Sequence, residues 1–132
     1  MKDRLISGKK IELRKSSIHG WGVFATDDIE SDEILEEVPF LILPIDKGET
    51  SSLLIDYRFN FPCGNWRHQV LPAGCSCYYN HSNTPNAGWR SDVENDIFIF
   101  STKEFIKKDS EIFVYYGNEN YWNDGRSDIK LL

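Results

Sequence analysis

The chain has 132 residues, the usual length of one domain, with 40% hydrophobic and 27% charged residues, as in most soluble globular proteins. Its formal net charge of -6 gives no basis for binding nucleic acid through phosphates. It favours a basic partner such as a lysine-rich peptide, although modest negative charge also serves solubility alone. No segment has the apolar length of a signal peptide or a membrane span, so we expect a soluble, intracellular protein with no membrane association.

The first half of the chain predicts short strands separated by turns. Alternating apolar and charged residues, or short apolar runs after turns, place strands at Lys10–Lys15, Val23–Ala25, Glu33–Glu37 and Pro39–Leu43. The next segments lack strand character: Ile45–Ser52 is expected to be loop, Leu53–Phe59 one or two helical turns, and Asn60–Cys77 irregular.

The second half gives a clearer pattern. We expect strands at Ala87–Arg90, at Asp96–Ser101, whose apolar run fits a strand buried on both faces, and at Glu111–Tyr116. The tail Asp124–Leu132 is expected to be poorly ordered unless it docks. Many short strands with frequent turns predict a compact, mainly β domain.

Three segments carry polar residues or glycines beyond what turns alone require. In Gly20-Trp21-Gly22, two glycines let the backbone approach a ligand closely while the indole covers one side, although a plain glycine turn explains the same residues. The segment Tyr78–Ser82, followed by Pro85-Asn86-Ala87, offers donors and acceptors for a small polar ligand, or a hydrogen-bonded turn with a structural histidine.

The third segment, Glu111–Gly117, ends a strand in two tyrosines and a glycine. Alternation along a strand puts Tyr115 and Tyr116 on opposite faces, so one tyrosine can join the core while the other faces a cleft.

The three cysteines, Cys63, Cys75 and Cys77, are an odd number and are expected to be reduced thiols. Cys75 and Cys77 leave open a redox or metal function, with His68 and His81 as further ligands on paper. The spacing lacks the two ligand pairs of a tetrahedral zinc site, so we expect no metal.

Taken together and in this order, the segments HGWGVFA, YNHSNTPNA and EIFVYYG closely resemble the SET domain of protein-lysine methyltransferases. The resemblance runs from about residue 10 to residue 122, which implies a single SET domain over residues 1–132 with a short C-terminal tail at 123–132. It also implies the family's fold: small curved β-sheets of the β-clip type, a few short helical turns, and a pseudoknot between the segment after the Asn-His motif and the strand that carries the tyrosine.

The resemblance assigns roles to residues of all three segments. S-adenosylmethionine is the implied cofactor, and the implied cofactor-binding residues are Gly20, Trp21, Gly22, Tyr79, Asn80 and His81, with His81 acting largely through its backbone. Tyr116 matches the family's catalytic tyrosine. The implied substrate-channel residues are Tyr57, which lies in a stretch similar to the small viral members, together with Val114, Tyr121 and Trp122; which of the last two lines the channel stays open.

The implied chemistry is an in-line displacement in which the ε-amine of a substrate lysine attacks a methyl group on a positively charged sulfur. The protein must align the atoms and present a neutral amine, although free lysine has a pKa of about 10.4. A narrow aromatic channel beside a sulfonium lowers that pKa by desolvation and like charge. A general-base role for His81 is the alternative, because an imidazole can take a proton near neutral pH.

The sequence departs from the family pattern at three places. Asn83 stands where many relatives have a zinc-binding cysteine, and no cysteine follows Cys77, so no zinc-binding tail is expected. Either Tyr121, Trp122 and the tail close the channel, or a second subunit does, which would make a homodimer. Val114 stands where the family often has Phe or Tyr, which predicts that products beyond monomethyl lysine are allowed.

The expected substrate is a lysine in a histone tail or another basic protein, and a histone substrate would place the protein in a nucleus, its own or a host's. The alternative is a SET-like module that binds a peptide or S-adenosylmethionine without turnover. An intact Tyr116 argues against that alternative, because a module without catalysis does not need it.

Overall fold

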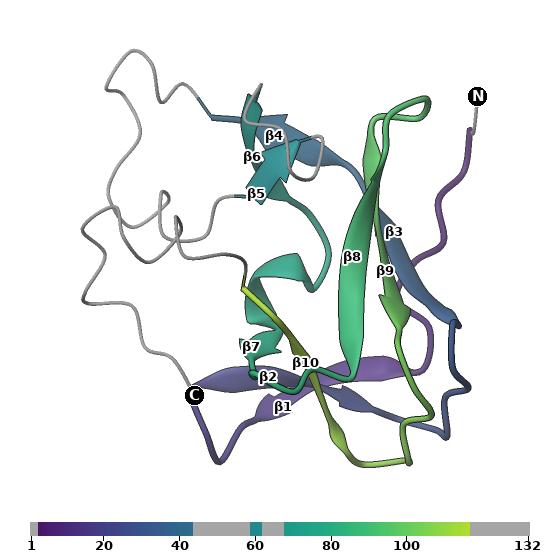
Figure 1. Ribbon diagram of the computed structural model, residues 1–132, viewed down its shortest axis with the longest axis vertical. Coiled ribbons are helices and arrows are strands. Elements are labelled where there is room, and N and C mark those ends of the chain that lie inside the picture. The colour runs from purple at the N-terminus through teal and green to yellow at the C-terminus, as the bar shows by residue number, and fades with distance from the viewer. Residues whose placement is uncertain (1–2, 44–58, 62–67, 117–132) are drawn as a thin grey trace.

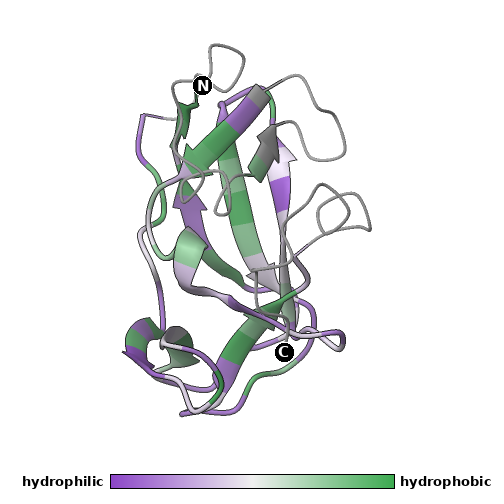
Figure 2. Cartoon of the chain, turned by 90° about the vertical axis from the view of Figure 1, so that its left-hand side faces the viewer, coloured by the Kyte–Doolittle hydropathy of each residue, from purple (hydrophilic) through white to green (hydrophobic). Residues whose placement is uncertain are grey.

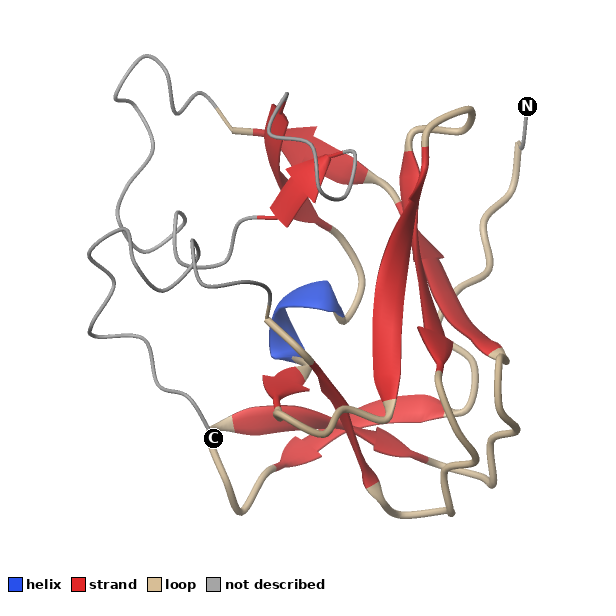
Figure 3. Ribbon diagram, in the orientation of Figure 1, coloured by secondary structure: helices blue, strands red, loops and turns tan. Residues whose placement is uncertain are grey.

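The structure is a computed structural model that describes residues 3–43, 59–61 and 68–116 (Figure 1). Its regular elements are short strands and one 3-10 turn: β1 (Ile11–Lys15), β2 (Trp21–Ala25), β3 (Ile34–Val38), β4 (Phe40–Ile42), β5 (Phe59–Phe61), β6 (His68–Pro72), η2 (Ser76–Tyr78), β7 (Asn80–His81), β8 (Ala87–Asp92), β9 (Ile97–Thr102) and β10 (Glu111–Val114). Figure 3 shows that the described part of the chain is mainly strand, as the sequence predicts. Over the same residues, no helix is long and apolar enough to cross a membrane.

The strands form three small sheets, with the orders β1-β2-β10-β7, β3-β9-β8 and β4-β6-β5. Pairing is antiparallel throughout, except that β10 runs parallel to β7. The strand β10, which is the last of the described strands in the sequence, thus occupies an inner position between β2 and β7 (Figure 1).

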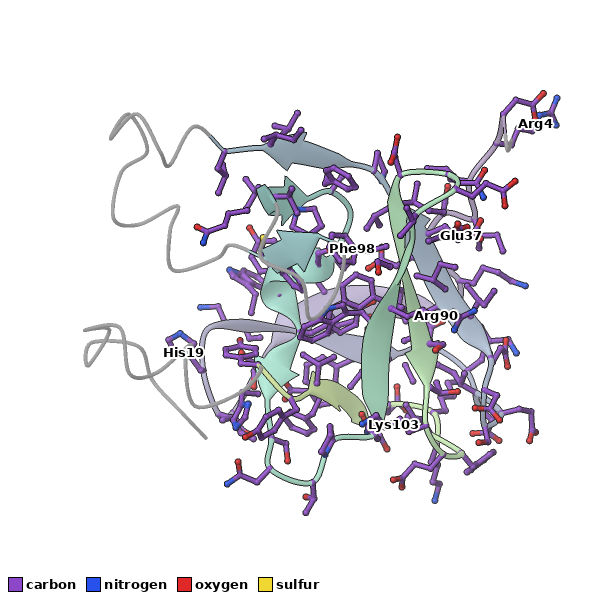
Figure 4. All side chains as sticks on the ribbon, turned by 45° about the horizontal axis from the view of Figure 1, so that its top comes forward. Arg4, His19, Glu37, Arg90, Phe98 and Lys103 are labelled. Carbon is purple, nitrogen blue, oxygen red and sulfur yellow. The ribbon has the colours of Figure 1, made fainter. Side chains whose placement is uncertain are left out.

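The core lies where the sheets face one another. The apolar run of β9 is buried on both faces, as its composition predicts. Phe98, labelled in Figure 4, contacts Phe40 of β4 and Phe59 of β5, with ring centroids 5.8 and 5.6 Å apart. Figure 2 shows hydrophobic colour on parts of the strands, interrupted by hydrophilic colour, and hydrophilic colour in many of the connections. The contacts of Phe98 with Phe40 and Phe59 join the β3-β9-β8 and β4-β6-β5 sheets.

The predicted strands are confirmed, with small changes at their ends, at β1, β2, β3, β4, β8, β9 and β10. The prediction that Asn60–Cys77 is irregular is wrong, because β6 lies within it and pairs with β4 on one side and β5 on the other. The hydrogen bonds to these two neighbouring strands stabilise β6 as a strand, and its local sequence does not predict them. Ile45–Ser52, Asp124–Leu132 and all but the last residue of the expected helical turns lie outside the described residues; that last residue, Phe59, begins β5.

Candidate functional site

The three segments singled out by the sequence come together around β10. Glu111 and Ile112 of β10 pair with Phe24 and Val23 of β2. On the other side, Phe113 and Val114 pair with Asn80 and His81 of β7. The strand that leads to the two tyrosines therefore holds the glycine-aromatic turn on one side and the Asn-His pair on the other.

Tyr116 follows the end of β10 and is fixed at both its backbone and its side chain. Its hydroxyl donates to the carbonyl oxygen of Tyr79 at 2.9 Å, and its backbone N–H donates to Nδ1 of His81 at 3.0 Å. The ring is partly buried and packs against the core. These bonds hold the hydroxyl against the backbone just before the Asn-His pair.

His81 is buried, and its hydrogen bonds define its tautomer. Because Nδ1 accepts the N–H of Tyr116, the ring proton of the neutral imidazole belongs on Nε2, which lies 3.0 Å from Oδ1 of Asn83. The ring centroid lies 5.1 Å from that of Tyr115 and 5.2 Å from that of Tyr116. Both nitrogens are thus engaged within the protein, which favours support of the tyrosine segment over the alternative general-base role.

Asn80 links the glycine turn to β10 through its side chain. Its Nδ2 donates to the carbonyl oxygen of His19 at 3.1 Å and to Oε2 of Glu111 at 2.8 Å. Oε1 of Glu111 accepts the hydroxyl of Ser16 at 2.8 Å. A Cβ atom at Gly22 would overlap Oε2 of Glu111 and lie 3.1 Å from Nδ2 of Asn80. A larger residue at position 22 would therefore displace the Glu111 carboxylate from this hydrogen-bonded cluster.

The turn before β2 presents an open surface. Gly20 has a φ of +51°, and a Cβ at this position would have no atom of the described residues within 4 Å. The indole of Trp21 is 51% exposed, with Nζ of Lys15 lying 5.7 Å from its ring centroid. Figure 4 shows His19 at the outer edge of the same turn. Bare backbone beside an exposed aromatic face fits a ligand with a flat or apolar portion and polar ends, as S-adenosylmethionine has.

Two predicted site residues have side chains in the core. Tyr79 is 1% exposed, and its ring stacks on Phe100 with centroids 4.8 Å apart, so only its backbone is available to a ligand. Val114 is also 1% exposed and belongs to the core cluster, so the size of its side chain acts first on packing. Tyr57, Tyr121 and Trp122, the other predicted channel residues, lie outside the described residues.

Asn86, which belongs to the second motif, holds β10 through two hydrogen bonds from its side chain to the strand's backbone, an arrangement called the Asn86 clamp below. Its Oδ1 accepts the N–H of Phe113 at 2.7 Å, and its Nδ2 donates to the carbonyl oxygen of Glu111 at 3.0 Å. One carboxamide thus bonds to β10 as a neighbouring strand would. The sequence does not predict this clamp or the Glu111 cluster. Each forms between segments that are distant in the sequence, and no local pattern shows which segments become neighbours.

The cysteine alternative has little support in the described residues. Burial, with a smaller contribution from the charge of Glu36, raises the pKa of the Cys75 thiol to about 11. Burial also raises the pKa of Cys77. Both thiols therefore stay protonated at neutral pH, which disfavours a reactive thiolate. Within the described ranges, no group of three or more His, Cys, Asp or Glu side chains could hold a metal ion.

Comparisons with known proteins identify the family of the chain. The SET domain family matches residues 20–117. A histone-lysine N-methyltransferase of Schizosaccharomyces pombe, specific for H3 lysine 37, is 28% identical over 125 residues, which cover 92% of this chain and 83% of the relative. The crystal structure of a proposed histone methyltransferase of Plasmodium falciparum is 33% identical and superposes with a TM-score of 0.71, covering 84% of this chain and 96% of that one.

A more distant solved structure shares the fold. It is a humanized mutant of the Chaetomium thermophilum Polycomb Repressive Complex 2, bound to the inhibitor GSK126; it is 24% identical, with a TM-score of 0.69 over 84% of this chain and 15% of the matched chain. The family match alone spans most of the chain, including the glycine turn, the Asn-His pair and Tyr116. The chain therefore belongs to the SET-domain family of protein-lysine methyltransferases.

Proposed function

We propose that the chain transfers a methyl group from S-adenosylmethionine to the ε-amine of a lysine in a histone or another basic protein. The observation that carries the proposal is the double attachment of Tyr116, through its hydroxyl to Tyr79 and through its backbone to His81. Asn80, the residue after Tyr79, donates to the carbonyl oxygen of His19, which precedes the surface at Gly20 and Trp21 where we place the cofactor.

When bound, S-adenosylmethionine supplies an electrophilic methyl group on a positively charged sulfur. The exposed indole of Trp21 and the bare backbone at Gly20 would hold it, with Gly22 keeping room for the Glu111–Asn80 cluster behind them. Asn80 is 4% exposed and His81 2%, with their side chains engaged inside the protein, so we assign their contribution to backbone atoms.

Tyr116 acts by position. Its hydroxyl hydrogen is directed to the carbonyl oxygen of Tyr79, and a phenol oxygen that donates in this way is also able to accept a hydrogen bond. An incoming neutral amine can donate an N–H to this oxygen and keep its own lone pair for the methyl carbon. Holding the amine in line in this way replaces a random encounter by an oriented one, a gain of roughly 7–11 kcal/mol in favourable cases.

The substrate class follows from charge and from relatives. The formal net charge of -6 attracts a basic peptide, and the Schizosaccharomyces pombe relative carries H3 lysine-37 specificity in its name. We extend histone methylation to this chain on those two grounds, and with it a nuclear place of action, in its own or a host's nucleus. The number of methyl groups added and a homodimeric state belong to the same proposal and are tested by mass spectrometry and gel filtration.

The test is transfer of radiolabelled methyl from S-adenosylmethionine to mixed histones and to a lysine-rich cell extract, with Tyr116→Phe as the variant. Loss of one positioned catalytic hydroxyl should lower the rate by about 10²-fold, while the affinity for the cofactor changes little. Tyr115→Phe is the matched control: its side chain is 44% exposed, and we expect wild-type transfer. Equal labelling by wild type and Tyr116→Phe would reject the assigned role.

The second candidate is a module that binds S-adenosylmethionine or a peptide without turnover. Measurable cofactor binding, together with no label on either substrate mixture from the wild-type protein, would favour it over the enzyme.

A further inference from the structure

A buried pair lies behind the site, formed by Glu36 of β3 and Tyr79. The Tyr79 hydroxyl donates to Oε2 of Glu36 at 2.7 Å, and the backbone N–H of Cys75 donates to Oε1 at 3.2 Å. The two side chains are almost completely buried, at 2% and 1% exposed. A carboxyl group in such a place costs free energy unless it is hydrogen-bonded, so the pair has a definite geometry.

Strand register explains why the two side chains meet. Glu36 lies opposite Phe100 in the antiparallel β3–β9 ladder, after a register shift between Ile34 and Glu36. Residues directly opposite each other project from the same face of a sheet. The Tyr79 ring stacks on that Phe100 ring with an interplanar angle of 11°, which brings its hydroxyl to the Glu36 carboxyl.

The turn before η2 closes over the same carboxyl. Gly74 has a φ of +68°, and a Cβ there would overlap Oε1 of Glu36 and lie 2.8 Å from Cγ1 of Val38. The chain thus approaches Glu36 as closely as a bare backbone permits, just ahead of Tyr79. Burial raises the pKa of Glu36 and also that of Tyr79, so the phenol keeps its proton and stays a donor at physiological pH.

Tyr79 connects this pair to the site. Its side chain is held by Glu36 and Phe100, while its carbonyl oxygen accepts the hydroxyl of Tyr116 at 2.9 Å. We infer that Glu36 and Tyr79 are positioning residues for methyl transfer: their buried hydrogen bond fixes the Tyr79 carbonyl, and that carbonyl aims the Tyr116 hydroxyl. The inference rests on the proposed function, because it assumes that Tyr116 is the catalytic tyrosine.

The first test is Tyr79→Phe, which removes the hydroxyl and keeps the ring on Phe100. We expect kcat to fall about tenfold, because a small misplacement of reacting groups lowers the rate of the chemical step. The Kd for S-adenosylmethionine should be unchanged. Thr102→Val is the matched control, because it deletes another buried hydroxyl of the β3-β9-β8 sheet, one that donates to the carbonyl oxygen of Glu30 and accepts the N–H of Glu33. It should lose stability and keep kcat.

The second test separates positioning from stability. Glu36→Leu should lower kcat as Tyr79→Phe does, whereas Glu36→Gln, which can still bond the phenol, should restore most of it. In the double variant Glu36→Leu/Tyr79→Phe both polar partners are gone, so the melting temperature should recover relative to Glu36→Leu. Its kcat should stay low. Recovery of kcat together with stability would overturn the inference, because packing alone would then hold the carbonyl.

The outcomes distinguish the two levels of the proposal. Wild-type protein that labels no lysine contradicts the proposed function. Equal labelling by wild type and Tyr116→Phe contradicts the catalytic role of Tyr116, on which this inference rests. Wild-type protein that is active and depends on Tyr116, combined with wild-type kcat in Tyr79→Phe, contradicts only the positioning role.

Discussion

The β3-β9-β8 sheet and the junction of β2, β10 and β7 are held together in different ways. The sheet depends on apolar packing, with Phe98 and Phe100 of β9 completely buried among other rings. The junction depends on polar side chains that bond to backbone across strands, such as Asn86 to β10 and Asn80 to the turn before β2. The first arrangement has no directional requirement, whereas the second specifies the position of individual atoms.

This difference matches what each region has to do. A packed sheet supplies stability in proportion to buried area, without directional demands. A site for in-line methyl transfer needs a hydroxyl and backbone carbonyls at defined places, and hydrogen bonds provide that direction. Tyr79 belongs to both regions, since its ring packs on β9 and its carbonyl bonds to Tyr116.

The largest expected effect comes from removing packing. Phe100→Ala deletes a completely buried ring that contacts Tyr79, Phe59 and Trp89, and large-to-small changes of this kind cost about 3–5 kcal/mol in the free energy of unfolding. Denaturant unfolding followed by tryptophan fluorescence measures it. A loss below about 1 kcal/mol would mean that the sheet collapses around the gap, and that packing there is less specific than the contacts indicate.

Breaking the Asn86 clamp should cost less in stability. Asn86→Ala leaves the N–H of Phe113 and the carbonyl of Glu111 without this partner, a loss of about 1–3 kcal/mol. Asn86→Asp keeps an acceptor for Phe113 but turns a carboxylate toward the Glu111 carbonyl. Its deficit should shrink as pH falls, because the protonated acid can donate again. Equal deficits for Asn86→Ala and Asn86→Asp at every pH would contradict the clamp.

The smallest effect concerns the pH dependence of stability. Because burial raises the pKa of Glu36 in the folded state, the folded protein binds this proton more tightly than the unfolded chain. Stability is then largest below the ordinary glutamate pKa and falls as pH rises toward the raised folded value. Glu36→Gln should remove this slope, so its deficit relative to wild type should be larger at acid than at neutral pH. Unfolding curves of wild type and Glu36→Gln across this pH range measure the deficit. A deficit that is the same at every pH would contradict the prediction.

The sequence predicts the packed region better than the polar junction. β9 is predicted directly from its residues, because an unbroken Ile-Phe-Ile-Phe run has few alternatives to a buried strand. β6 cannot be predicted in the same way, because its five residues include a proline and gain strand structure by pairing on both sides. Motif resemblance assigns roles to Tyr116 and the Asn-His pair. The contacts of Glu36 and Glu111 depend instead on strand register, which the local sequence does not give. The local signal that could have drawn attention to this place is a pair of acids, Glu36 and Glu37, between Leu35 and Val38, and it does not distinguish the two.

The inner place of β10 has a consequence for synthesis of the protein. A ribosome releases β2 and β7 before it releases β10, yet β10 lies between them, antiparallel to one and parallel to the other. The gap between β2 and β7 must therefore stay open, or reopen, until the strand emerges. Contacts between segments so far apart in sequence form slowly. The Tyr116 hydroxyl is thus among the last atoms of the described chain to reach its place, so a nascent chain lacks this part of its site until β10 has docked.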